Sequence, residues 1–445
     1  MELKNKHIHF IGIGGISMSA LAHFAIANGA IISGSDIQEN EETSKLRELG
    51  CNIYVGHNSE NIKDYVEFVV YSSSIKKDNE EYKEAVFRNL YMMTRADFLA
   101  EISKKYKNVI AVAGSHGKTT TTAMLAKILI DAGMDPTVHI GGNWSEIGGN
   151  YRLGGSKYFV TEACEYDKSF LSLRPMYLII TNIDWDHVDT YPTPELYKGA
   201  FNILLKRCKM DGCVISDIQT INKNAKCNSK IVKISEKHIQ NIKSYKKYCY
   251  SYDFYFAGES VQDIELSVPG EFNVYNSAKV VALALALGVS KEIIKESLKN
   301  FTGVCRRFEK AGTFCGGDVI VDYAHHPTEI KENIHLVKEN VGGKLHCVFQ
   351  PHTFSRTSVL WHDFCAAFDE VDDLILYPIY PAREWPMPNV TSEKLAHAIA
   401  QRGISCRYLD SFAKIKSWLA SVVSPGDVVL ILGAGNIANL RDVIV

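Results

Sequence analysis

The sequence predicts an α/β protein with three domains, each built on a sheet wrapped by helices. The chain has 445 residues, more than one hydrophobic core usually organises. Short apolar runs alternate along it with helix-like stretches, the pattern of parallel strands joined by crossover helices. We therefore place the domains at 1–107, 108–302 and 303–445, where this succession restarts.

The first two domains follow the same alternation. The first reads as a doubly wound sheet, with strands at 8–13, 30–33 and 67–71 and helices at 17–28, 42–49 and 80–87. The second, with a mainly parallel sheet, is expected to contain strands at 108–114, 157–162 and 177–181 and helices at 118–132 and 274–287. Short segments rich in Lys, Asn and Tyr between 215 and 267 predict peripheral strands or insertions.

The third domain is also expected to be doubly wound. Its strands are predicted at 318–322, 345–349, 374–377 and 427–432, and its helices at 328–339, 358–369, 392–401 and 411–422.

Charge and cysteine content exclude several classes of protein. The net charge is −2 and no Lys/Arg-rich block occurs, so neither a nucleic acid nor a membrane is an expected partner. Eleven cysteines without C-x-x-C spacing fit neither a disulfide framework nor a zinc site, and they favour a reducing, cytoplasmic location. The N-terminus lacks a signal-peptide pattern, and the apolar stretch 278–289 is too short to span a bilayer. Small-molecule partners are favoured.

A glycine-rich turn lies between an apolar strand and a helix in AVAGSHGKTTTTAM (111–124). Such a turn points backbone N–H groups at an anion, backed by the helix N-terminus. Lys118 is expected to reach ATP phosphates and the Thr119 hydroxyl to reach Mg²⁺. The standard motif has Gly where Val112 stands, so this is a shortened variant. A turn of purely structural use would leave the G-K-T-T sequence unexplained.

Polar residues follow two further strands of this domain. Glu162 ends the strand YFVTE, and Asn182, Asp184, Asp186 and His187 follow YLII. Ligands of α/β sheets bind beyond the carboxyl ends of strands, so a carboxylate and an imidazole there are candidates for holding Mg²⁺. The alternative is that they are strand-end and turn residues, with His187 capping a helix.

A second glycine turn, HFIGIGGISMSAL (9–21), precedes the first predicted helix. It resembles a dinucleotide fingerprint, with Asp36 ending the next strand, but Ser17 stands where the third Gly belongs. Pyrophosphate binding and a tight structural turn both remain open for it.

Eight motifs along the chain resemble those of the Mur ligases, in family order: GIGGISMSALA (12–22), AGSHGKTTTT (113–122), TNIDWDHVDTY (181–191), GVCRRFE (303–309), DYAHHPTEI (322–330), FQPHTFSRT (349–357), YPAREWP (380–386) and LGAGNI (432–437). The resemblance implies an N-terminal Rossmann-like UDP-binding domain, a central P-loop ATPase, and a C-terminal Rossmann-like domain that binds the amino acid and closes over the site.

Within that family the motifs are most similar to the branch that makes the first amide bond of the peptidoglycan precursor. The resemblance implies ATP-dependent ligation of L-alanine to the lactyl carboxylate of UDP-N-acetylmuramate through an acyl phosphate, giving UDP-MurNAc-L-Ala, ADP and phosphate. ATP and Mg²⁺ are the implied cofactors, and a monomer or homodimer is expected.

The resemblance also implies roles for individual residues. Those expected at ATP are Gly114, Ser115, His116, Gly117, Lys118, Thr119, Thr120, Asn276 and Arg307, with Thr119, Glu162 and His187 at Mg²⁺. The UDP-sugar is expected along Gly14, Gly15, Ser73, Arg95, Gly142 and Asn143. The amino-acid end is expected at Tyr323, His325, His352 and Arg356, with His325 or His352 accepting the amine proton. The catalytic set is Lys118, Glu162, His187, His325 and Arg356.

Three motifs depart from the family pattern. The motif E-A-D-E-S-D reads E-A-C-E-Y-D at 162–167, R-H-N reads Glu271–Phe272–Asn273, and the Arg of Q-P-H-R-Y-S-R is Thr353. Thr353 removes a cation near the amino-acid carboxylate, so amino-acid affinity or preference is expected to differ.

Four rival functions were weighed. A relative that attaches a whole tripeptide is disfavoured because GIGGISM lacks a cysteine in the glycine turn, and a folylpolyglutamate synthase because of the N-terminal UDP-sugar domain. A nicotinamide-dependent oxidoreductase leaves the G-K-T loop unexplained. A catalytically inactive scaffold does not fit the retention of Lys118, Glu162 and His187 together.

Overall fold

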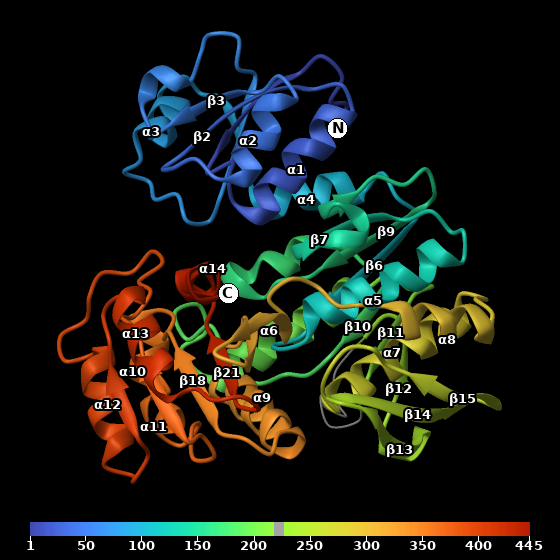
Figure 1. The fold of residues 1–445 in the computed structure, drawn as a ribbon. Helices are drawn as coiled ribbons and strands as arrows, with labels where there is room; N and C mark the ends of the chain where they lie inside the picture. Colours follow the sequence, from blue (N-terminus) through green and yellow to red (C-terminus); the bar gives the residue numbers. More distant parts are fainter. Residues whose placement is uncertain (218–226) are drawn as a thin grey trace. The chain divides into compact units, whose positions relative to one another are not determined.

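The computed structural model describes residues 1–217 and 227–445, which form α/β layers around four β-sheets (Figure 1). These residues divide into two compact units. The first comprises 1–183 and 198–234, and the second comprises 184–197 and 235–445. The predicted α/β class and the mainly parallel sheets are confirmed.

The sheet at the N-terminus is entirely parallel, with strand order β3-β2-β1-β4-β5. Its strands are β1 (His7–Ile11), β2 (Ile31–Asp36), β3 (Asn52–Val55), β4 (Phe68–Tyr71) and β5 (Tyr91–Thr94), and its helices are α1 (Ile16–Ala27), α2 (Glu41–Glu48), α3 (Glu80–Phe87) and α4 (Arg95–Ser103). The strand order reverses at β1, so the glycine turn after β1 lies at a topological switch point, where ligands of open sheets bind. Strands β3 and β5 are not predicted from the sequence, because each has only four residues and most of them are at least partly exposed.

The second sheet of the first unit has the order β12-β11-β10-β6-β9-β7-β8 and is parallel except for β8. Its strands are β6 (Asn108–Ala113), β7 (Thr137–Trp144), β8 (Gly149–Arg152), β9 (Tyr158–Glu162), β10 (Tyr177–Ile180), β11 (Cys213–Ser216) and β12 (Lys230–Lys233), with α5 (Lys118–Asp131) and α6 (Pro194–Arg207). The central strand β6 is buried along its whole length, as its apolar sequence predicts. Helix α1 packs against β7 and β8, where the rings of His23 and Tyr151 stack 4.5 Å apart.

The second unit contains a small antiparallel sheet formed by β13 (Ile239–Lys246), β14 (Cys249–Phe256) and β15 (Glu259–Glu265). Helices α7 (Phe272–Ala286) and α8 (Lys291–Asn300) pack on it and bury apolar side chains. The segment predicted to hold peripheral strands thus forms a sheet of its own over 239–265, and its residues 218–226 lie outside the described part of the chain.

The remaining sheet has the order β16-β17-β21-β18-β19-β20 and is parallel except for β16. Its strands are β16 (Glu309–Phe314), β17 (Gly317–Asp322), β18 (Leu345–Phe349), β19 (Asp373–Leu376), β20 (Cys406–Tyr408) and β21 (Val428–Leu432). The helices are α9 (Pro327–Asn340), α10 (Phe354–Val359), α11 (Trp361–Cys365), α12 (Ser392–Ala400), α13 (Phe412–Val422) and α14 (Arg441–Ile444). Apolar cores cover both faces of this sheet.

One predicted helix is wrong in outline. The stretch 358–369 was expected to be a single helix, but two short helices meet at Leu360. The first starts earlier because the Thr353 side chain accepts a hydrogen bond from the Arg356 amide and caps α10. Over the ranges that the structure describes, none of the helices has the length and apolar character needed to cross a bilayer.

Candidate functional site

The loop 114–117 connects β6 to α5 and is shaped by two glycines with positive φ. Gly117, at φ +77°, is the N-cap of α5, and Gly114 has φ +136°. A Cβ on Gly114 would lie 2.0 Å from the Thr181 hydroxyl, so no side chain fits there. The loop brings backbone N–H groups to the start of a helix, which is the geometry of an anion site.

The two residues that follow β10, Thr181 and Asn182, hold this loop by hydrogen bonds to His116. The Thr181 hydroxyl donates to the His116 carbonyl at 2.6 Å, and the Asn182 side chain accepts from the His116 amide at 2.9 Å. The Asn182 amide group also donates to the His116 carbonyl at 3.1 Å. Asn182, one of the polar residues predicted at this strand end, therefore positions the loop 114–117.

Lys118 folds back over the loop that precedes it. Its Nζ donates to the carbonyls of Gly114 at 2.6 Å and Ser115 at 2.9 Å, and it pairs with the buried Glu165 carboxylate at 2.9 Å. Burial acts to lower the pKa of Lys118, but the nearby carboxylates, chiefly Glu165, outweigh it and raise this pKa. Lys118 is therefore a fixed positive charge. The motif E-A-C-E-Y-D contains Glu165 but does not indicate its role; the signal for that role is that a buried lysine needs a buried counter-ion.

Glu162 is the last residue of β9 and is paired with Val112 of β6. It thus lies at the carboxyl end of these strands, where the loop 114–117 begins. Its carboxylate accepts from the Gly141 amide at 2.7 Å, and a Cβ on Gly141 would lie 2.9 Å from that carboxylate. Thr119 and Thr120 are buried in the first turn of α5, at the same end of the sheet. A threonine hydroxyl and a carboxylate are oxygen donors of the type that Mg²⁺ takes. His187, the third predicted metal ligand, lies in the second unit.

The N-terminal glycine turn is held by side chains of the next strand and helix. The Gly14 amide donates to the Asp36 carboxylate at 2.9 Å, and the Asn40 amide group donates to the Gly14 carbonyl at 3.1 Å. The other Asp36 oxygen accepts from the Ile37 amide. Asp36 therefore bonds the glycine turn itself. Gly15 is the N-cap of α1.

Ser17, which replaces the third fingerprint glycine, belongs to a chain of hydrogen bonds inside the first unit. Arg95 donates to the Ser17 hydroxyl at 3.1 Å, Ser17 lies 2.9 Å from His139 Nε2, and His139 Nδ1 lies 3.0 Å from the Thr161 hydroxyl. Burial and the Arg95 charge lower the pKa of His139 to about 3, so its imidazole is neutral. His139 lies in no recognisable motif, so its role is not predicted from the sequence.

The other predicted sugar-binding positions lie on nearby loops and strands. Ser73 follows β4, and Gly142 and Asn143 belong to β7. The Asn143 side-chain oxygen is buried and accepts no hydrogen bond from any residue in the described ranges. A buried acceptor of this kind fits a ligand hydroxyl or amide.

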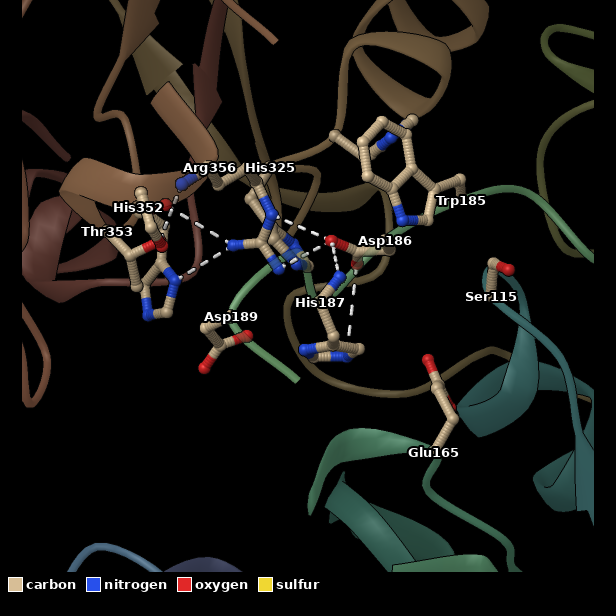
Figure 2. Close-up of polar contacts among 12 residues, drawn as sticks. Ser115, Glu165, Trp185, Asp186, His187, Asp189, His325, His352, Thr353 and Arg356 are labelled. Carbon is tan, nitrogen blue, oxygen red and sulfur yellow. Dashed lines mark hydrogen bonds and ion pairs between the residues drawn. The ribbon is translucent and has the colours of Figure 1, made fainter. Parts of the chain in front are cut away.

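In the second unit a buried ion pair joins two distant segments (Figure 2). The Arg356 guanidinium donates to one Asp186 oxygen through Nε at 2.9 Å and Nη2 at 2.8 Å. The His187 amide donates to the same oxygen at 2.6 Å. Burial acts to raise the pKa of Asp186, but Arg356 and the surrounding histidines hold it well below its usual range. The alternative that His187 caps a helix is not observed: it lies in a turn at φ +51°.

Two histidines predicted at the amino-acid end lie beside this pair. His352 Nδ1 is 3.2 Å from Arg356 Nη1, and the rings of His352 and His325 are 5.8 Å apart in an edge-on arrangement. His325 Nδ1 lies 3.0 Å from the Tyr323 carbonyl. The pKa of His325 is lowered to about 3, mainly by burial and further by the Arg356 charge. Burial, His325 and Arg356 together lower the pKa of His352 to about 2. Both imidazoles are neutral near pH 7.

Three family models match successive parts of the chain. They are the Mur ligase family catalytic domain at 7–107, the Mur ligase middle domain at 112–284, and the Mur ligase glutamate ligase domain at 306–435. The chain belongs to the Mur ligase family.

Individual Mur ligases match along their full length. A UDP-N-acetylmuramate–L-alanine ligase of Clostridium kluyveri is 44% identical over 99% of this chain and 98% of its own. One from Clostridium botulinum strain Langeland is 43% identical over 99% and 97%. Among solved structures, the UDP-N-acetylmuramate-alanine ligase MurC of Thermotoga maritima has a TM-score of 0.83 and 29% identity, covering 98% of both chains. A murein peptide ligase from Psychrobacter arcticus has a TM-score of 0.73 at 24% identity, covering 99% and 98%, and this shows the shared fold.

Asn276 and Arg307, predicted at the nucleotide of this Mur ligase, both lie in the second unit. Asn276 is buried on α7 and donates to Asn273 at 3.3 Å. The Arg307 guanidinium lies 4.9 Å from the centre of the Tyr323 ring, and Arg306 lies 5.0 Å from it. Arg306 also donates to the Gly433 carbonyl at 2.9 Å, which ties the C-R-R-F-E turn to the end of β21.

Proposed function

We propose that this Mur ligase joins L-alanine to the lactyl carboxylate of UDP-N-acetylmuramate, with ATP converted to ADP and phosphate. The observation that carries the proposal is the identity of 42–44% to UDP-N-acetylmuramate–L-alanine ligases along the full chain. Lys118, fixed over a glycine loop by Glu165, supplies the phosphate-binding feature that an amide ligase of this class requires.

The first step is expected to phosphorylate the sugar carboxylate, because a carboxylate does not condense with an amine in water. Negative charge develops on the transferring phosphoryl group. The Lys118 ammonium and the N–H groups of loop 114–117 are preorganised to stabilise it. Mg²⁺, with Thr119, Glu162 and His187 as the expected ligands, supplies further neutralisation of phosphate charge when bound.

In the second step the amine of L-alanine attacks the acyl phosphate, forming the C–N bond as phosphate leaves. The amine must then give up a proton. Neutral His325 and His352 can each accept a hydrogen bond from it, and an imidazole of such low pKa takes a proton readily only from the acidic ammonium formed after attack. Comparison of His325→Gln with His352→Gln will decide which imidazole accepts the proton.

The proposal also covers the cellular location, the oligomeric state and the closure of the C-terminal part. All eleven cysteines are free thiols, which suits a reducing compartment, and we propose the cytoplasm. A monomer or homodimer is expected, to be checked by light scattering. The C-terminal part is expected to close over the acyl phosphate during turnover and to keep water from it.

The test is phosphate release from ATP and Mg²⁺ with UDP-N-acetylmuramate, comparing L-alanine, glycine, other amino acids, a tripeptide and no acceptor. Lys118→Ala is the inactive variant. Lys127→Ala is the matched control, because Lys127 lies on the same helix and pairs with Asp131 and Glu146. We expect release that needs both the sugar and L-alanine. Dependence on the tripeptide would reassign the acceptor, and no release with any acceptor would reject the ligase function.

A further inference from the structure

Two of the eleven cysteines meet at the end of helix α6, within the first unit. Cys208 directly follows α6 and is buried, and its thiol donates to the Leu204 carbonyl with Sγ 3.7 Å from the oxygen. The partly exposed Cys227 donates to the neighbouring Leu205 carbonyl, with Sγ 3.5 Å from the oxygen. The two thiols also hydrogen bond to each other. The fold therefore brings together two thiols that belong to separate segments.

The segment that carries Cys227 is fixed to the same helix end by its next two side chains. The Asn228 side chain donates to the Lys206 carbonyl at 2.8 Å, and the Ser229 hydroxyl donates to the Lys209 carbonyl at 2.6 Å. Strand β12 follows at once and pairs with β11. Three consecutive side chains and a strand thus set the position of Cys227 against its partner thiol.

The two thiols share a proton unequally. A hydrogen bond from the Cys208 thiol, with further ones from Ser229, lowers the pKa of Cys227. The same interaction between the thiols, together with burial, raises the pKa of Cys208. Burial also raises the pKa of other thiols, including Cys51 and Cys164. Because the thiolate is the nucleophile in thiol chemistry, Cys227 is the attacking member of the pair and Cys208 the resolving member.

The pair lies at the opposite end of the strands from the loop 114–117. Lys209, next to Cys208, donates from its amide to the Pro175 carbonyl, just before β10 begins. Cys227 likewise lies just before β12, and β6, β10, β11 and β12 run parallel. Both thiols are therefore at the amino ends of these strands, whereas the loop 114–117 follows the carboxyl end of β6.

We propose that Cys208 and Cys227 form a reversible redox site that reacts with low-molecular-weight disulfides. The Cys227 thiolate attacks one sulfur of the small disulfide, forms a mixed disulfide and releases one small thiolate. The Cys208 thiol then attacks the Cys227 sulfur, and the second small thiol leaves with the Cys208 proton. The first small thiolate takes up the proton that Cys227 lost on ionising, so two protein thiols are oxidised and one small disulfide is reduced to two thiols.

This site is independent of the proposed ligase function, and it is compatible with a reducing compartment. Disulfides of cytosolic proteins are usually transient, and an excess of small thiols returns the pair to its reduced form. The disulfide would tie the end of α6 to the segment before β12, which is the edge strand of its sheet.

The first measurement is a thiol count after equilibration of the full chain with oxidised glutathione. The remaining thiols are alkylated in denaturant and counted by mass spectrometry, and peptide mapping locates the linkage. We expect two of the eleven thiols to be lost and residues 208 and 227 to be joined. Cys208→Ser should stop at the mixed disulfide on Cys227, whereas Cys227→Ser should form neither product. Cys213→Ser is the matched control, because Cys213 begins β11 beside the pair and should not be needed.

The stability of the oxidised protein gives a second readout. Closing a loop between α6 and β12 should raise the melting temperature of the first unit by roughly 5–10 °C, and dithiothreitol should reverse this rise. Turnover of ATP should change by less than about twofold, because the loop 114–117 lies at the other end of the strands.

Three results would overturn the proposal. They are a full count of eleven thiols after equilibration, a glutathione adduct that persists on Cys227 in the wild-type protein, and a linkage that involves Cys213 in place of either member. A melting temperature that rises equally in Cys227→Ser would also contradict it, because that variant cannot form the cross-link.

Discussion

The phosphate loop of the first unit is residues 114–117, and the arginine–histidine cluster of the second unit is Arg356 with Asp186, His325 and His352. The two are built in opposite ways. The loop is one short stretch of chain, and the anion site that we propose for it comes from backbone N–H groups and a lysine folded back on its own loop. The cluster collects side chains from three separate segments around one buried ion pair. Backbone sites of this kind are fixed by local sequence, whereas charge clusters depend on the tertiary fold that brings distant residues together.

The largest expected effect is on the cluster. Arg356→Gln leaves the Asp186 carboxylate buried without its cation, which should lower the free energy of unfolding by about 3–5 kcal/mol. Urea unfolding of the full chain measures this. The double variant with Asp186→Asn should recover a large part of the loss, because no uncompensated charge remains. A double variant no more stable than Arg356→Gln alone would mean that the pair is not the cause.

The next effect tests the backbone geometry of the loop. Gly114→Ala places a Cβ against Thr181 at positive φ, so the loop should be destabilised by about 2–4 kcal/mol and ATP turnover should fall by about two to three orders of magnitude. Gly133→Ala is the matched control, because Gly133 also has positive φ but meets nothing within 4 Å. Similar activity in the two alanine variants would contradict the steric argument.

A smaller effect is expected from the counter-ion of the loop lysine. Glu165→Gln removes the charge that raises the pKa of Lys118. The lost charge-assisted hydrogen bond contributes about 1.5–3 kcal/mol. The basic limb of the pH profile of kcat/KM for ATP should therefore move to lower pH. Glu146→Gln, which removes a partner of Lys127 on the same helix, should leave the profile in place. An unmoved profile in Glu165→Gln would show that Glu165 does not control this charge.

The smallest effect concerns pH and the two histidines of the cluster. Their pKa values, about 3 and about 2 in the folded protein, lie below the usual 6.5, so the unfolded chain binds more protons below pH 6.5. Stability should then fall as pH falls from 6.5 toward 3, by about 1–2 kcal/mol per histidine between pH 6.5 and 5. His325→Gln should flatten this dependence in urea unfolding, whereas exposed His397→Gln should not. Equal slopes would contradict neutral burial of His325.

The same contrast explains what could be predicted from sequence. Strands β6, β18 and β21 are buried along their whole length and were recognised by their apolar runs. Short, half-exposed strands such as β3 and β20 carry no such pattern. Gly114, Gly117 and Lys118 were found because one contiguous motif contains them.

The motifs predicted Tyr323, His325, His352 and Arg356 together at one site, but the pairing of Arg356 with Asp186 could not be predicted, for a physical reason. Asp186 and Arg356 are 170 residues apart, and nothing in either local sequence specifies the other as partner. Glu165 was missed because its importance comes from burial against Lys118 and not from its motif. The predicted site roles and domain boundaries remain predictions for the experiments above.

The division of the chain has a consequence for biosynthesis. Residues 184–197 belong to the second unit, although the chain before and after them, to Ile183 and from Lys198, belongs to the first. A ribosome that adds about 5–20 residues per second completes Asp186 roughly 10–30 s before Arg356. Throughout that interval the nascent first unit must fold around a loop whose aspartate has no cation to meet. This segment of the emerging polypeptide therefore stays without its ion-pair partner until synthesis has passed residue 356.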